Sequence, residues 1–134
     1  MSEFEAALAP WVGSRQVLTL NSGTSALHLA LRLSGVTFGD EVISTAMTCT
    51  ATNEPIVERG AKIVWADIDP RTGNIDPNRI EAAITSRTKA ILPVHYAGRP
   101  VDAGAIGTIA QRHGLTVIDD AAHAVEARST VGKV

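Results

Sequence analysis

Several patterns are scarce in this 134-residue chain, and each absence excludes a class of protein. A single cysteine, Cys49, excludes an internal disulfide and a zinc site built from several cysteines. The four histidines show no i, i+4 pair or other ligand spacing, so the sequence predicts no metal site. No apolar run is long enough to span a membrane, and we expect no membrane partner.

An excess of one charge is also missing. The 12 Lys and Arg residues nearly balance the 14 Asp and Glu residues, and the basic residues are scattered, which disfavours a nucleic-acid partner. The first ten residues, MSEFEAALAP, lack the basic and apolar regions of a signal peptide, so we expect a cytoplasmic protein. The 45% hydrophobic and 19% charged residues are typical of a folded globular domain.

Apolar runs separated by glycine or proline stops divide the rest of the chain. We expect strands at 15–20, 41–45, 62–66, 89–94 and 115–119. We expect helices from residue 2 to Pro10, at 25–35 and 51–60, from Pro77 with Asp76 as N-cap, and at 101–114. The strands are nearly continuous apolar runs, which are typical of strands covered on both faces. The predicted fold class is α/β, a mostly parallel sheet with helices on both faces.

The stretch VLTLNSGTSALHLAL (17–31) places a polar, glycine-centred turn between two apolar runs. Gly23, Thr24 and Ser25 follow an expected strand at its carboxyl end, where parallel sheets bind ligands. They also open a helix, whose first amides carry partial positive charge and can hold an anion, with the Thr24 and Ser25 hydroxyls as further donors. The stretch predicts a phosphate-binding turn or, alternatively, an ordinary strand-to-helix turn with a polar N-cap.

The stretch VIDDAAHA (117–124) places two acids after a buried apolar strand, at the same edge of the sheet. Successive side chains of a strand point to opposite faces, so Asp119 and Asp120 cannot share one role. One acid could pair with a cationic ligand group, and His123 could reach the same ligand. The alternative is a helix N-cap followed by a surface histidine. His95, at the end of the apolar run 88–95, is a further candidate for lining the site.

A phosphate-binding turn and a buried carboxylate at one sheet edge fit pyridoxal 5′-phosphate. A carboxylate beside the ring nitrogen keeps that nitrogen protonated, so the ring can draw electrons from a substrate carbanion. A dinucleotide-binding Rossmann domain is disfavoured because NSGTSA is not a G-x-G-x-x-G motif. The acids nearest the expected ribose position, Asp40 and Glu41, belong to a turn before the next strand.

With these segments in view, the sequence resembles the DegT/DnrJ/EryC1/StrS sugar aminotransferases, which are pyridoxal-phosphate enzymes of fold type I. The resemblance covers almost the whole chain, and the order and spacing of its pieces make it specific. These pieces are FEAALA, NSGTSALHLAL, GDEVIST, TATNEPIVERGAKIVWADIDPRTGNIDP, RTKAILPVHYAG and HGLTVIDDAAHA. The branch it resembles aminates keto groups on nucleotide-linked sugars.

The resemblance implies roles for individual residues. Gly23, Thr24 and Ser25 match the family's phosphate-binding turn. Asp120 matches the aspartate at the pyridine nitrogen, and Asp119 falls where the family often has an acid that does not contact the cofactor. His123 matches a Gln or His on the hydroxyl side of the ring. Cys49 falls where many relatives stack an aromatic residue on the ring; a thiol could pack there, and a plain core cysteine is the alternative.

The end of the chain departs from the family pattern. Family members hold the cofactor on a lysine well downstream of the aspartate, whereas Lys133 is the sole lysine after Asp120 and lies in STVGKV, which resembles a surface hairpin. We therefore expect residues 1–134 to be part of the large cofactor-binding domain, a fragment without the family's N-terminal segment, lysine segment and C-terminal small domain. The isolated chain is expected to be inactive.

Two functions follow from this comparison. The first is a fragment of a pyridoxal-phosphate-dependent aminotransferase, with a nucleotide-linked keto sugar as substrate, an amino donor such as glutamate and a homodimeric assembly, all implied by the resemblance. The second is a non-catalytic binding or scaffold module that retains the fold.

Overall fold

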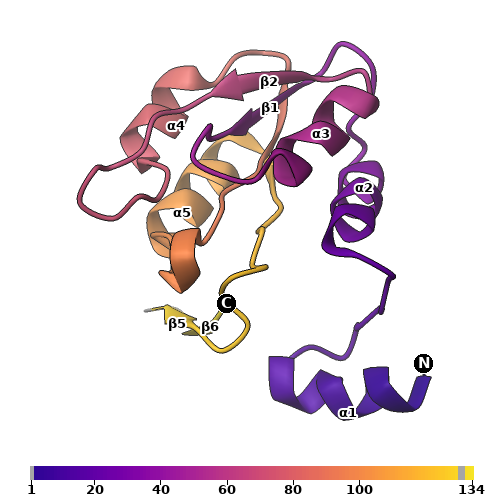
Figure 1. Cartoon of the computed structure of the whole chain (residues 1–134). Helices are drawn as coiled ribbons and strands as arrows, with labels where there is room; N and C mark the ends of the chain where they lie inside the picture. The colour runs from indigo at the N-terminus through magenta and orange to yellow at the C-terminus, as the bar shows by residue number, and fades with distance from the viewer. Residues whose placement is uncertain (1, 130–131) are drawn as a thin grey trace.

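The computed structural model describes residues 2–129 and 132–134, and its main body is a parallel sheet with helices on either side (Figure 1). The strand order is β2-β1-β3-β4, and all three pairings are parallel. The elements are α1 (Ser2–Val12), α2 (Gly23–Leu33), β1 (Glu41–Ser44), α3 (Thr50–Glu58), β2 (Lys62–Trp65), α4 (Pro77–Ala83), β3 (Thr88–Ile91), the 3₁₀ turn η1 (Tyr96–Gly98), α5 (Ala103–His113), β4 (Thr116–Val117), β5 (Arg128–Ser129) and β6 (Gly132–Lys133).

The hydrophobic core lies in two layers, one on each face of the sheet. Neighbouring strand residues enter different layers: Val42 packs with Leu31 of α2 and Ile56 of α3, whereas Ile43 packs with Ile80 of α4 and Ile106 of α5. All six side chains are at most 1% exposed. The prediction of a mostly parallel sheet with helices on both faces is therefore confirmed, because strand residues pointing either way meet an apolar helix.

The expected strand at 15–20 is wrong. Within the described residues this segment pairs with no strand. The backbone N–H of Thr19 instead donates to the carboxylate of Glu5 in α1 at 2.8 Å, and the Thr19 hydroxyl donates to the same oxygen. A β-strand exists only where another strand supplies the ladder hydrogen bonds, so an apolar, β-prone run is not sufficient. Leu18, 64% exposed, accordingly lies outside both core layers.

Strands β3 and β4 are shorter than expected at their carboxyl ends. The prediction placed them at 89–94 and 115–119, whereas β3 ends at Ile91 and β4 at Val117. Pro93 has no N–H to donate and interrupts the ladder. The pairing nevertheless resumes beyond the proline, where Val94 and Asp120 form a parallel bridge. The chain after β4 is thus held against the chain after β3 at the edge where the candidate site was expected.

The helix boundaries follow local signals. Asp76 caps α4 by accepting from the Asn78 N–H at 2.9 Å, as its position before Pro77 predicts. Gly114 ends α5 in the left-handed conformation (φ 65°), as the glycine stop predicts. The first helix differs from the prediction, since α1 continues past Pro10 to Val12. None of the described helices is long and apolar enough to cross a membrane.

The C-terminal segment contains an antiparallel strand pair, as the resemblance of STVGKV to the family's hairpin implies; residues 130 and 131, between the two strands, lie outside the described ranges. Strands β5 and β6 pair antiparallel, with Arg128 opposite Lys133 and Ser129 opposite Gly132. The Lys133 ammonium donates to the Trp11 carbonyl and lies 4.3 Å from the centroid of the Trp11 ring. The hairpin therefore contacts α1, which is set apart from the sheet and its helices (Figure 1).

Candidate cofactor site

The two acids after β4 have separate partners, as their alternation along the strand predicts. The Asp120 backbone pairs with the chain that follows β3: its N–H donates to the Pro93 carbonyl at 3.0 Å, and its carbonyl accepts from the His95 N–H at 3.1 Å. The Asp120 side chain lies toward α3, where its Oδ2 accepts from the Thr52 hydroxyl at 2.7 Å. The side chain of Asp119 accepts instead from the His95 ring.

Each oxygen of the Asp120 carboxylate accepts a hydrogen bond that fixes the orientation of the group. Oδ1 accepts from the Ala122 N–H at 3.1 Å, and Oδ2 accepts from the Thr52 hydroxyl. A carboxylate has about four lone-pair positions, so each oxygen can accept one further hydrogen bond. Asp120 is partly exposed, and it can therefore offer a fixed negative charge to a cationic N–H from outside the chain.

His95 is an interior residue, 2% exposed, and does not line an open surface. Its Nδ1 accepts from the Val101 N–H at 3.2 Å, which places the ring proton on Nε2. Nε2 donates to Asp119 Oδ1 at 3.2 Å. His95 therefore links the start of the α5 segment to the end of β4, and it stabilises the backbone from which Asp120 projects.

The first turn of α2 has the geometry of a helix N-terminus with free donors. Ser22 is the N-cap: its Oγ accepts from the Ser25 N–H at 3.1 Å and donates to Ser25 Oγ at 3.0 Å. The Ser25 amide is therefore occupied, but its hydroxyl proton is still available. The amides of Gly23 and Thr24 precede the first intrahelical hydrogen bonds. A Cβ built on Gly23 would meet nothing within 4 Å, so this turn is open to an approaching anion.

The remaining predicted residues lie apart from this network. Cys49 is exposed and precedes α3 as its N-cap, without a side-chain capping bond. It lines a cavity of about 510 Å³ with Thr48, Val57 and Trp65. The His123 side chain is also exposed. Among the described residues no hydrogen bond joins Asp120 directly to Cys49, to His123 or to the first turn of α2. The connection to α2 is indirect: α3 packs on α2, and Thr52 of α3 donates to Asp120.

The turn after Asp120 packs closely on η1. Gly98 has φ +81°, and a Cβ added to it would lie 2.9 Å from the backbone oxygen of His123. Only glycine fits both this backbone conformation and this approach. The sequence singled out neither Gly98 nor the threonines Thr48 and Thr52. Thr48 precedes α3 and Thr52 lies in its first turn, four positions later. Asp120, the partner of Thr52, is 68 positions further along the chain, so no local pattern could have revealed the contact.

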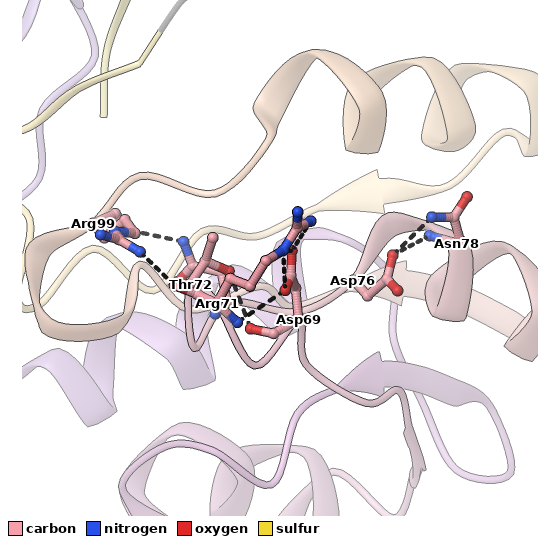
Figure 2. Close-up of polar contacts among 7 residues, drawn as sticks. Asp69, Arg71, Thr72, Asp76, Asn78 and Arg99 are labelled. Carbon is pink, nitrogen blue, oxygen red and sulfur yellow. Dashed lines mark hydrogen bonds and ion pairs between the residues drawn. The ribbon is translucent and has the colours of Figure 1, made fainter.

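A larger cavity of about 960 Å³ lies between the loop that follows β2 and the start of α5, and none of the predicted site residues lines it. Figure 2 shows that polar groups of this loop bond to one another and to Arg99, which follows η1. The Arg71 guanidinium forms three hydrogen bonds to Asp69, and Arg99 donates to the Arg71 carbonyl at 2.9 Å. Asn74 holds the loop to the chain after η1 by donating to the Pro100 carbonyl at 2.9 Å.

This loop predicts a pH effect. The side chain and then the backbone N–H of Arg71 lower the pKa of Asp69 from 3.8 to about 2. A depressed carboxyl pKa contributes stability that is present above pH 3.8 and is lost as the pH falls through about 2. We expect Arg71→Gln to have a lower free energy of unfolding than wild type at pH 6. This difference in stability should narrow as the pH falls from 3.8 to about 2. Unfolding curves at each pH measure it, and a difference that is unchanged at pH 2 would contradict the assignment.

The fold and the site define a class. The chain is an α/β domain with free N–H donors at the start of α2 and a partly exposed, oriented carboxylate, that of Asp120, after β4. The full chain, residues 1–134, matches the sequence profile of the DegT/DnrJ/EryC1/StrS aminotransferase family, and the chain belongs to that family. A curated relative, the spore coat polysaccharide biosynthesis protein SpsC of Bacillus subtilis (strain 168), is 49% identical over 125 residues, which cover 93% of this chain and 32% of the relative.

Solved structures show the same fold. DesV of S. venezuelae, in complex with a ketimine intermediate, superposes with a TM-score of 0.96 at 39% identity and covers 99% of this chain and 36% of its own. DesI, in the presence of its TDP-sugar product, gives a TM-score of 0.89 at 39% identity and covers 98% of this chain and 33% of its own. Spr1654 of Streptococcus pneumoniae, in its PLP form, gives a TM-score of 0.91 at 32% identity and covers 98% of this chain and 37% of its own. The architecture is that of fold type I pyridoxal-phosphate aminotransferases, and the chain spans about a third of these relatives.

Proposed function

We propose that the protein containing this chain is a pyridoxal-phosphate-dependent aminotransferase that aminates a keto group on a nucleotide-linked sugar. One observation carries the proposal: in a chain of this family, the aspartate that follows β4 has a fixed carboxylate with lone pairs left for a cationic N–H. The sugar class is supported by DesI, whose product is a TDP-sugar.

The residues present fit pyridoxal phosphate at both of its ends. The Gly23 and Thr24 amides and the hydroxyls of Thr24 and Ser25 would hold the phosphate, because they are free donors at an uncrowded helix N-terminus. Asp120 would keep the ring nitrogen protonated. When bound, the cofactor supplies an electron sink for a carbanion beside the transferred amine. The exposed His123 and Cys49 would contact the hydroxyl side and the face of the ring.

Lys133 is not the lysine that holds the cofactor in this proposal. Its ammonium is engaged by the carbonyl and the ring of Trp11, and it lies on the hairpin that contacts α1. Residues 1–134 would then form part of the large cofactor-binding domain, and this portion by itself would be inactive. A lysine elsewhere in the full-length protein would form the covalent bond and move the substrate proton.

The proposed partners are a nucleotide-linked keto sugar, an amino donor such as glutamate and a second copy of the chain. Exposed apolar side chains support self-association: Phe4 of α1 is 62% exposed and Leu18 is 64% exposed. Light scattering of the full-length protein is expected to give the mass of a dimer.

The test is aminotransfer by the full-length protein. It is incubated with pyridoxal phosphate, glutamate and a panel of TDP-linked keto sugars, and mass spectrometry follows the aminated sugar and 2-oxoglutarate. Parallel samples are reduced with borohydride, and the modified lysine is mapped. An adduct on Lys133 would contradict the lysine assignment. Cofactor binding without an amine product on any keto sugar would favour the non-catalytic module.

A further inference from the structure

We propose that Thr52 is a positioning residue for the Asp120 carboxylate and that Thr48 supports it through a relay of two hydroxyl groups. The relay fixes the orientation of the carboxylate, whose free lone pairs would accept from the cofactor ring nitrogen. This inference rests on the proposed function, and its test separates the two.

The direction of the relay follows from counting protons. Thr52 Oγ1 lies 2.7 Å from Asp120 Oδ2 and 2.7 Å from Thr48 Oγ1. An ionised carboxylate only accepts, so the single hydroxyl proton of Thr52 is donated to Asp120. Thr52 Oγ1 must then accept from Thr48. The order is Thr48 to Thr52 to Asp120, and each donation strengthens the next because the acceptor becomes a more polarised donor.

The Thr52 hydroxyl bonds to Thr48 and Asp120 and does not cap α3. Thr52 lies in the first turn of α3, where its backbone N–H donates to the Cys49 carbonyl at 3.0 Å. The side chain is free of that capping role and reaches the end of β4. Thr52 is 2% exposed, so this contact is shielded from water. A buried hydroxyl held between two partners has a single orientation, and it fixes the plane of the carboxylate to which it donates.

A neutral donor suits this position. A lysine or arginine beside Asp120 would neutralise the carboxylate and compete with the protonated ring nitrogen. A hydroxyl group orients the carboxylate and leaves its negative charge in place for the ligand. Thr52 therefore acts on the cofactor through Asp120 and does not touch it.

The experiment measures binding without activity. The full-length protein, freed of its cofactor, is titrated with pyridoxine 5′-phosphate, whose alcohol cannot bond to a lysine, and with the analogue that has carbon in place of the ring nitrogen. Thr52→Val keeps the shape and removes the hydroxyl, Thr52→Ser keeps the hydroxyl, and Thr48→Val removes the first donor. Thermal unfolding of each variant tests whether it is folded.

We expect Thr52→Val to bind pyridoxine phosphate about tenfold more weakly, close to the worth of one hydrogen bond to a charged group. Thr52→Ser should bind within about twofold of wild type and Thr48→Val between the two, because a relayed bond is worth less than a direct one. The carbon analogue should bind wild type and Thr52→Val equally, since it has no ring N–H for Asp120. If Thr52→Val does not fold, the affinities of Thr48→Val for the two ligands test the positioning role instead.

Two results overturn the positioning role and leave the proposed function intact. In the first, Thr52→Val weakens both ligands equally, which is the signature of a structural effect. In the second, Thr52→Val and Thr48→Val leave the preference for the nitrogen ring unchanged. If wild type binds both ligands equally, or binds neither, the proposed function fails together with the inference.

Discussion

Asp120→Asn in the full-length protein is expected to reduce the kcat/KM of aminotransfer by about 10²- to 10³-fold, the usual cost of removing a preorganised electrostatic partner of the reacting group. The amide has the shape of the carboxylate and can still accept from Thr52. It has no negative charge, so the ring nitrogen loses the partner that keeps it protonated. Kinetics with a keto sugar and glutamate measure the loss, and circular dichroism tests whether the fold is retained.

The neighbouring acid provides the matched control. Asp119 accepts from the interior His95 and has a side chain that is 47% exposed. A partly exposed pair is worth about 0–1 kcal/mol, so Asp119→Asn should change kcat/KM by less than about fivefold. Equal losses in the two variants would show that the acids act together through the backbone of the strand end and that Asp120 has no special contact with the cofactor.

Gly98→Ala is expected to destabilise the full-length protein by about 2–3 kcal/mol, because it combines a strained backbone with a close contact. The residue has φ +81°, and the new methyl group would lie 2.9 Å from the His123 carbonyl oxygen. The chain between Asp120 and His123 would have to move away from η1. We therefore expect weaker binding of pyridoxal phosphate as well as a lower Tm.

Gly107→Ala is the control for this substitution and should have the opposite sign. Gly107 lies within α5, and a Cβ built there meets nothing within 4 Å. Alanine favours the helix over glycine by about 0.8–1 kcal/mol, so stability should rise and cofactor binding should not change. A Gly98→Ala variant as stable as wild type would mean that the close approach seen at His123 is not maintained in solution.

Part of the candidate site could be predicted from the sequence because it depends on local rules. Strand alternation sends Asp119 and Asp120 to different partners, and the structure places His95 beside one and Thr52 beside the other. The polar, glycine-centred turn before an apolar helix predicts a polar N-cap, and the structure assigns that cap to Ser22. Binding of pyridoxal phosphate by these residues remains a prediction.

Other features depend on residues that are distant in the sequence. The run at 15–20 is as β-prone as the true strands, yet the N–H of Thr19 bonds to Glu5 and no strand lies beside it among the described residues. Gly98 resembles any loop glycine until the His123 carbonyl is placed against it.

The sequence by itself determined the α/β class, the two-sided burial of the strands, the caps of α4 and α5 and the family, because each follows from periodicity, residue chemistry or the order of short motifs. The tertiary structure alone decided which strands pair, which side chain holds the Asp120 carboxylate and which glycine is required. These depend on contacts between positions brought together only by folding, such as Thr52 and Asp120, for which no local pattern exists.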